Sequence, residues 1–318
     1  MLRTPLTDRF SLGLPIVGAP MAGAGGSGLA AAVSRAGGLG MIGVGAGAEP
    51  DWIGRAADEA RAAAGRFGIG LMAWNLARRP EQLEAALAAG PSLVSVSFGD
   101  YRPALGPLQR AGIAVATQVG DVESARRAEG EGVDVVVARG GEGGGHGDDR
   151  VGTLPLLQGV LEAVGEETLV LAAGGIATGR GLAAVLAAGA AGAWIGTALL
   201  ASVEALTPAE GRRRLLEAGE LDTVSTSVFD VAQELPWPAR YRGRALANAF
   251  TARWHGREEE LAADPAARRA LAEARQEGDY DTAFLYAGQG VGSLSSVTTA
   301  RQVVEEMAAD AEALLRRW

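Results

Sequence analysis

The sequence contains no cysteine and no lysine, and all 29 of its basic residues are arginine. The missing cysteine excludes disulfide bonds, thiolate catalysis and thiolate metal sites. With 38 acidic residues the formal net charge is -9 at pH 7, which repels phosphate backbones, so we expect no nucleic-acid partner. Aromatic residues make up only 5% of the chain. The core is therefore predicted to consist mainly of Ala, Val, Leu and Gly, which favour close packing of helices on a sheet.

Two stretches, residues 11–34 and 181–203, lack charged side chains and are long enough to cross a bilayer. The first contains two Pro and six Gly, which would break a spanning helix, and the second divides at Gly189 into a helical and a strand-like part. Buried strands of a parallel sheet have the same composition, so we expect no membrane contact. Asp8 and Arg9 interrupt the region where a secretory signal would be apolar, so we expect a cytoplasmic protein.

Short apolar runs bounded by Gly or Pro alternate with longer Ala-rich runs in which charges recur at helical spacing. This alternation is typical of βαβ units and a parallel sheet. Eight strands are predicted, at residues 15–19, 39–43, 67–72, 93–97, 113–117, 133–138, 169–173 and 193–196. Seven helices are predicted between them, at residues 28–35, 50–64, 80–89, 102–110, 122–129, 154–164 and 179–188. Eight strand-helix units favour an α/β fold of the (β/α)8 TIM-barrel type over an open sheet.

From residue 205 the sequence changes character. Residues 207–210 form a capping box with Pro at the first helical position, and a Trp/Pro-rich segment and a glycine turn follow. A last helix begins at Thr299 and carries one apolar stripe. We therefore expect a barrel at residues 1–204 and a mainly helical C-terminal extension at residues 205–318, packing on or over the barrel. The chain is predicted to act as a monomer or a homodimer.

Chemically distinctive residues follow most of the predicted strands. In barrels of this kind the working face is formed by the carboxyl ends of the strands. The residues in question are Pro20 and Met21, Asn75, Phe98, Gln118, the run from Arg139 to His146, Gly174 and Gly175, and Gly196 and Thr197. We therefore predict a functional site on this rim.

The glycine pairs after the last two strands indicate a phosphate site. Backbone N–H groups of residues 174, 175, 196 and 197 can approach a phosphate closely, and the helix that begins near Thr178 adds its positive end. Backbone donors suit a chain that lacks lysine. The alternative is that these glycines only form tight strand-helix turns.

A dinucleotide-binding pattern is a second interpretation of the glycines. Gly23, Gly25 and Gly28 match G-x-G-x-x-G after a strand, and Glu49 follows at a distance that suits a ribose contact. That pattern predicts an open sheet with one nucleotide crevice and leaves the glycines after the later strands unexplained.

His146 is one of two histidines and ends a run of Gly and Glu on the predicted rim. Few packing partners are expected there for a structural histidine, so we interpret it as catalytic. Asp148 and Asp149 follow it, but one His with two adjacent acids is a poor metal site; we predict no metal and interpret both acids as solvated loop charges or caps. His255 lies in a charged segment and is predicted to be on the surface.

At these residues the sequence resembles the nitronate monooxygenase family, whose members are FMN-dependent barrels. The resemblance extends over nearly the whole chain and is carried by PIVGAPMAG, AGGLGMIG, AAGGIATGRG, GAWIGT, LPWPARYRGRALANAF and YAGQGVG. It implies oxidation of alkyl nitronates, and in a broader form of nitroalkanes, with O2 to a carbonyl compound and nitrite, a detoxifying activity. His146 would be the active-site base. FMN would be held by Ala19, Pro20, Met21, Ala22, Asn75, Gln118, Arg139, Gly144, Gly145, Gly174, Gly175, Gly196 and Thr197.

One residue departs from the family's pattern, because the loop that usually begins with Gln begins here with Arg139. Two orientations remain open. The guanidinium either lies near the flavin N1/C2 carbonyl, where it would stabilise reduced, anionic flavin, or turns outward and pairs with Glu142 or Asp148. The Arg that usually follows the GT pair is replaced by Ala198, which leaves phosphate binding to backbone donors.

Related flavin enzymes leave the reaction open. NAD(P)H-dependent enoyl-acyl-carrier reductases and NADH:quinone reductases share the Met21-Ala22 turn, the glycine-histidine loop and the glycine pairs. They need a nicotinamide donor, so NADH or NADPH should bleach their flavin rapidly without oxygen. A flavin-free binding barrel is a third alternative, which a colourless protein would favour. Met21, Phe98, Trp194 and Trp237 are candidates for an apolar pocket wall.

Overall fold

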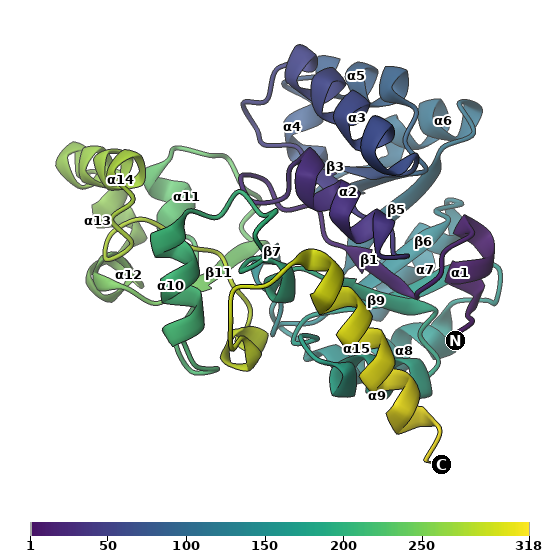
Figure 1. The fold of residues 1–318 in the computed structure, drawn as a ribbon. Coiled ribbons are helices and arrows are strands. Elements are labelled where there is room, and N and C mark those ends of the chain that lie inside the picture. Colours follow the sequence, from purple (N-terminus) through teal and green to yellow (C-terminus); the bar gives the residue numbers. More distant parts are fainter. Residues whose placement is uncertain (1, 318) are drawn as a thin grey trace.

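The computed structural model describes residues 2–317, which form a barrel of eight parallel strands with helices around it (Figure 1). The strands follow the order β1-β9-β8-β6-β5-β4-β3-β2, and a parallel bridge between Val17 and Leu39 nearly closes the circle. The predicted (β/α)8 fold is confirmed. The strands are β1 (Ile16–Gly18), β2 (Met41–Gly43), β3 (Gly68–Met72), β4 (Leu93–Ser97), β5 (Ala114–Val119), β6 (Val135–Arg139), β8 (Leu169–Ala173) and β9 (Gly192–Ile195).

Alternate side chains of each strand enter two separate cores. Val135 and Val137 of β6 belong to the cluster inside the barrel, whereas Val136 and Ala138 belong to the cluster between strands and helices. Because successive strand residues point to opposite faces and both faces are covered, the strands are mostly apolar. The outer cluster is rich in helix alanines such as Ala57, which lets the helices approach the sheet closely.

The barrel helices agree with the predicted ranges to within two residues. They are α2 (Ser27–Arg35), α3 (Pro50–Ala64), α5 (Glu81–Ala89), α6 (Arg102–Arg110), α7 (Val122–Gly130), α8 (Thr153–Ala163) and α9 (Gly179–Ala187), with the short α4 (Ala73–Leu76) and the 3-10 turn η1 (Thr197–Leu199). An additional helix, α1 (Pro5–Phe10), was not predicted. It is capped by the side chain of Thr4, and its Leu6 is fully buried in the inner cluster. No helix among the described residues is long and apolar enough to cross a membrane.

The chain leaves the barrel after β9 and returns at the same place. Ser202 and Thr298 form a parallel bridge, and the backbone N–H of Val203 donates to the carbonyl oxygen of Thr298 at 2.9 Å. The last helix, α15 (Ala300–Leu315), then packs against α9 and α2, in the place of an eighth barrel helix (Figure 1). The predicted boundary after residue 204 would exclude α15 from the layer of helices around the barrel, to which it belongs. We therefore propose to describe residues 203–298 as an inserted lobe.

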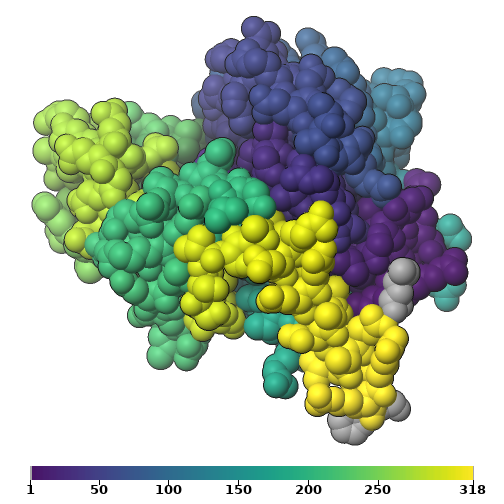
Figure 2. Space-filling model, viewed as in Figure 1, coloured from purple at the N-terminus to yellow at the C-terminus, as the bar shows by residue number. Residues whose placement is uncertain are grey.

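The lobe joins the barrel through a small antiparallel sheet. Its elements are α10 (Ala209–Glu217), β10 (Thr223–Thr226), α11 (Val228–Ala232), β11 (Arg242–Leu246), α12 (Ala249–Trp254), α13 (Glu258–Ala262), α14 (Pro265–Glu277) and the 3-10 turn η2 (Gln289–Ser293). Strand β11 pairs antiparallel with β10 and also with β7 (Gly145–Gly147), which belongs to the loop after β6. Figure 2 shows the lobe in green and yellow-green beside the purple and blue part of the barrel.

Candidate active site

A cavity of about 840 Å³ lies at the carboxyl ends of the barrel strands, between the barrel and the lobe. The loops after seven of the barrel strands contribute to its lining, β5 contributes Gln118 from the strand itself, and residues of the lobe contribute as well. The predicted base His146 lines the cavity, together with every predicted FMN-binding residue except Asn75: Ala19, Pro20, Met21, Ala22, Gln118, Arg139, Gly144, Gly145, Gly174, Gly175, Gly196 and Thr197. The four candidates for an apolar wall, Met21, Phe98, Trp194 and Trp237, line it too.

Asn75 lies behind the cavity wall. Its side-chain amide donates to the carbonyl oxygen of Ala46 and to Oε1 of Gln82, both at 3.0 Å. Gln82 in turn donates to the carbonyl oxygen of Ala48 at 2.9 Å. Because residues 45–48 line the cavity, the buried Asn75 shapes the wall indirectly and makes no lining contact of its own.

Two glycines, in β2 and β3, leave room for the turn that follows β1. A Cβ on Gly70 would lie 2.3 Å from the Cβ of Pro20, and a Cβ on Gly43 would lie 2.3 Å from the carbonyl carbon of Met21. Real Cβ atoms do not approach this closely, so glycine is required where the turn crosses β2 and β3. This crossing presents Met21 to the cavity.

The glycine pairs form a cradle with free backbone donors. Gly174 and Gly175 have φ of +105° and +69°, and a Cβ on Gly174 would lie 2.7 Å from Oγ1 of Thr153. Among residues 2–317, the N–H groups of Gly175, Gly196 and Thr197 find no acceptor. Unpaired N–H groups lining a concave site are suited to an anion, so the cradle fits the phosphate of FMN.

Arg139 supports the glycine loop from inside. Nη2 donates to the carbonyl oxygens of Gly143 (2.6 Å), Gly144 (3.3 Å) and Gly145 (3.0 Å), and Nη1 donates to that of Asp148 (3.3 Å). The side chain is buried and bonds to no carboxylate, so the outward orientation is wrong. Burial, with a smaller contribution from the nearby Arg244, lowers the pKa of Arg139 to about 10, so it stays charged at neutral pH.

The glycines of the loop make room for this guanidinium. A Cβ on Gly147 would lie 2.4 Å from Cζ of Arg139, and one on Gly143 would lie 2.7 Å from its Nε. Glu142, which precedes Gly143, accepts hydrogen bonds from the backbone N–H and hydroxyl of Thr153 at the start of α8. Gly143 and Gly147 are therefore explained by the packing of the loop around Arg139, without any ligand.

His146 is backed by a carboxylate from the lobe. Its Nε2 lies 2.9 and 3.0 Å from the two carboxylate oxygens of Asp230 in α11, and both side chains are less than 10% exposed. Because an ionised carboxylate only accepts, Nε2 carries a hydrogen, and in the neutral imidazole the lone pair is then on Nδ1. Sequence reasoning missed Asp230, which the pairing of β7 with β11 brings near His146.

Aromatic side chains cover the site. The ring of Trp237 stacks on the imidazole of His146 with centroids 3.5 Å apart and an interplanar angle of 1°. Trp237 also contacts Trp74 at 5.2 Å and Phe98 at 5.3 Å. Phe98 has φ of +69°, a conformation that non-glycine residues rarely adopt and that is concentrated at functional sites.

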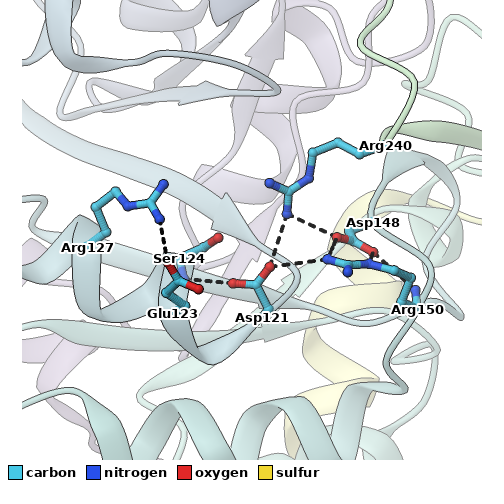
Figure 3. A network of polar contacts seen from close by, with 7 residues as sticks. All are labelled: Asp121, Glu123, Ser124, Arg127, Asp148, Arg150 and Arg240. Atoms are coloured by element: carbon cyan, nitrogen blue, oxygen red, sulfur yellow. Dashed lines mark hydrogen bonds and ion pairs between the residues drawn. The ribbon is translucent and has the colours of Figure 1, made fainter.

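A charge network around the buried carboxylate of Asp148 connects the lobe to the segment that follows the glycine loop (Figure 3). The carboxylate of Asp148 accepts hydrogen bonds from Arg150 at 2.6 Å and from Arg240 of the lobe at 3.0 Å, and Arg240 also reaches Asp121 at 3.1 Å. The hydrogen bond from Arg150 lowers the pKa of Asp148 to about 2. Asp148 is therefore buried and paired, so it is not a solvated charge, but its carboxylate also caps the backbone N–H of Arg150 at 3.2 Å, which was the other expected role. The carboxylate of Asp149 accepts a hydrogen bond from the hydroxyl of Ser225.

The other polar expectations concern metals and the second histidine. Within residues 2–317, no group of three or more metal-ligating side chains lies together. His255 is exposed, as predicted, and its Nδ1 lies 3.0 Å from the hydroxyl oxygen of Thr226.

A barrel with a cradle of free backbone donors and a carboxylate-backed histidine at its mouth is an arrangement suited to an oxidoreductase. The family described as nitronate monooxygenase matches residues 70–310, and the chain belongs to this family.

Relatives that match nearly the whole chain carry different names. The chain is 30% identical to the (3aS,4S,5R,7aS)-5-hydroxy-7a-methyl-1-oxo-octahydro-1H-indene-4-carboxyl-CoA dehydrogenase of Mycobacterium tuberculosis, over 98% of this chain and 96% of the relative. It is similar to FabK from Thermotoga maritima, with a TM-score of 0.86 and 29% identity over 100% and 98% of the two chains. It is also similar to nitroalkane oxidase from Streptomyces ansochromogenes, with a TM-score of 0.82 and 31% identity over 98% and 99%.

Proposed function

We propose that this protein is an FMN-dependent nitronate monooxygenase, which converts alkyl nitronates and O2 to a carbonyl compound and nitrite. Membership of the family and similarity to a nitroalkane oxidase support this reaction. The observation that carries the proposal is the pairing of His146 with Asp230 at a cavity that is also lined by backbone N–H groups free to bind a phosphate.

The residues present suit FMN. The free N–H groups of Gly175, Gly196 and Thr197 would hold its phosphate without any lysine. The Pro20-Met21 turn and the glycine loop would border the ring, because both line the same cavity. When bound, FMN supplies the redox chemistry between the nitronate and O2.

His146 would prepare neutral nitroalkanes for this reaction. Its Nδ1 can accept the proton from the carbon next to the nitro group, because Nε2 is engaged with Asp230. The carboxylate then stabilises the imidazolium that forms. Trp237 and the lobe keep the pair away from bulk water, since the His146 side chain is only 9% exposed.

Two comparisons test the proposal. His146→Ala should lower kcat/KM for a neutral nitroalkane by about 10²–10⁴-fold and affect the preformed nitronate far less, because only the nitroalkane needs a base. Equal losses with both substrates would refute the base assignment. Anaerobic mixing with propionate 3-nitronate, an alkyl nitronate and NADH in separate experiments should bleach the yellow protein with the nitronates only.

The similarity to FabK and to a dehydrogenase favours one alternative function, an NAD(P)H-dependent flavin reductase. Rapid anaerobic bleaching by NADH or NADPH, with no response to nitronates, would establish that alternative. A protein that stays colourless after incubation with FMN would instead indicate a flavin-free binding barrel.

A further inference from the structure

The imidazole of His146 lies in a slot whose walls come from the lobe. The indole of Trp237 covers one face of it, with ring centroids 3.5 Å apart and planes 1° from parallel. Every other pair of aromatic rings among the described residues has centroids 4.9 Å or further apart. The ring of Tyr286 is tilted against the imidazole at 5.2 Å, and a Cβ on Gly243 of β11 would lie only 3.3 Å from its Nε2. Since Asp230 also holds Nε2, these walls restrict rotation of the imidazole.

Barrel residues hold the indole in turn. The ring of Trp237 lies 5.2 Å from that of Trp74 and 5.3 Å from that of Phe98, and these two residues follow β3 and β4 directly. Pro236 and Pro238 flank Trp237, and each proline fixes its own φ. The indole therefore has a defined place between the barrel rim and the imidazole.

The stacked indole also suits the product of proton transfer to His146. In this step the C–H bond next to the nitro group breaks, its electron pair forms the C=N bond of the nitronate with the charge on the nitro oxygens, and the proton goes to Nδ1. The imidazolium that results presents its positive face to Trp237. Tryptophan is the side chain whose π face attracts a cation most strongly, and the attraction grows when water is excluded. Water is largely excluded here, because the His146 side chain is only 9% exposed.

We propose that Trp237 is a positioning residue for proton abstraction. It holds the plane of the imidazole so that Nε2–H stays on Asp230 and Nδ1 is available to the substrate, and its π face stabilises the imidazolium. This role rests on the proposed function, because it requires His146 to act as a base. The holding of the ring does not depend on the reaction and can be measured without a substrate.

The kinetic test compares two replacements of Trp237. Trp237→Phe keeps an aromatic face against the imidazole, whereas Trp237→Leu removes it. Trp237→Leu should lower kcat for a neutral nitroalkane by about tenfold with little change in KM, and Trp237→Phe should keep kcat within about threefold of the wild type, because a smaller π face remains. Neither variant should change kcat for the preformed nitronate, which needs no base.

Trp52→Leu is the matched control. Trp52 is another partly buried indole, which packs on the outer face of the barrel and does not line the cavity, so its loss should leave kcat for both substrates unchanged. Equal losses for nitroalkane and nitronate in Trp237→Leu would overturn the positioning role. No loss for the nitroalkane in that variant, or an equally large loss in Trp237→Phe, would overturn it as well.

Nuclear magnetic resonance separates the stack from the reaction. The chain contains only two histidines, so the imidazole signals of the FMN-loaded protein can be assigned with His146→Ala. In the wild type and in Trp52→Leu the Nε2–H of His146 should exchange slowly with water, because it is bonded to Asp230 beside the indole. Trp237→Leu should accelerate this exchange at least about tenfold, because the covered N–H then opens to water more often.

The same spectra contain a control for the fold. In Trp237→Leu the imidazole C–H signals of His146 should shift, since they lose the ring current of the indole, while those of His255 should stay in place. If exchange and signals change in this way while no nitroalkane is oxidised, Trp237 holds the ring and the proposed function fails. If exchange and signals of His146 are the same in Trp237→Leu as in the wild type, the positioning role is overturned, whatever the reaction is.

Discussion

Replacing Arg139 by Gln, the residue that the family usually carries, tests how the glycine loop is held. In the structure Nη1 and Nη2 together serve the carbonyl oxygens of Gly143, Gly144, Gly145 and Asp148. A glutamine amide is shorter and carries two N–H donors on one nitrogen, so at least two of these carbonyls lose their partner.

The expected loss of stability follows from these contacts. A hydrogen bond from a charged donor contributes about 1.5–3 kcal/mol, and because three of the four contacts share Nη2 we count two bonds. Removing a buried charge also returns part of its desolvation energy, which offsets some of the loss. We therefore expect Arg139→Gln to lower the free energy of unfolding by about 2–4 kcal/mol. Looser packing of residues 143–146 should also weaken FMN binding, since these residues line the cavity.

Urea unfolding followed by tryptophan fluorescence measures this effect. Arg127→Gln is the matched control, because Arg127 forms an exposed ion pair with Glu123 on α7. Such pairs contribute about 0–1 kcal/mol, so the control should unfold nearly as the wild type does. If Arg139→Gln unfolds with the same midpoint and slope as the control, the loop does not depend on the guanidinium. The buried charge would then be explained better by an interaction with the flavin.

Three further predictions concern the contacts between barrel and lobe. Asp230→Asn keeps the size of the side chain but removes the charge that stabilises the imidazolium. The kcat/KM for a neutral nitroalkane should therefore fall about 100-fold, with little change in kcat/KM for the nitronate. A parallel fall for both substrates would contradict this role of Asp230. Because the pKa of Asp148 lies at about 2, below its usual 3.8, its pairing stabilises the fold above about pH 4, and this stability is lost as the pH falls toward 2. The pKa shift corresponds to about 2 kcal/mol, so Asp148→Asn should lower the free energy of unfolding by that amount at pH 7. In acid titrations the free energy of unfolding of this variant should also fall less steeply between pH 4 and pH 2 than that of the wild type. An unchanged slope would show that other groups cause the acid sensitivity. Gly288→Ala would place a Cβ 2.5 Å from the carbonyl oxygen of Glu142 and so displace the lobe from the glycine loop. In FMN titrations this variant should bind FMN at least about tenfold more weakly than the control Gly54→Ala, whose Cβ meets open space. Equal affinities of the two variants for FMN would show that the loop tolerates the shift.

The barrel was predictable from local patterns because its strands are buried on both faces. Runs such as residues 135–138 and Leu169–Ala173 are apolar and end at polar or glycine-rich turns, so their limits are visible in the sequence. The strands of the small sheet show no such pattern. Gly145–Gly147 and Arg242–Leu246 have neither an apolar run nor regular alternation, and they are strands only because they pair with each other.

The same difference applies to the site. Residues that follow barrel strands could be assigned to one rim because the topology fixes where parallel strands end. Asp230 could not, because it lies in a short helix whose distance from His146 depends on the pairing of β7 with β11. The orientation of Arg139 was equally inaccessible. Its partners are backbone carbonyl oxygens of the loop at residues 143–148. From the sequence, the glycines of this loop could equally provide room for a ligand or room for the guanidinium. Only the folded loop shows that Gly143 and Gly147 leave room for the guanidinium.

The division of the site between barrel and lobe explains why similar chains carry different names. The phosphate cradle, the Pro20-Met21 turn and the strand-end residues all belong to the barrel, whereas Asp230, Trp237 and Arg275 belong to the inserted lobe. Binding a flavin at the proposed site would therefore depend mainly on the barrel, which also supplies His146, whereas the surroundings of the substrate would depend mainly on the lobe. Identity near 30% over the whole chain averages the two parts, so it fits a dehydrogenase and a nitroalkane oxidase equally well. We therefore expect substitutions at the positions of residues 203–298 that face the cavity to change the preferred substrate while leaving flavin binding intact.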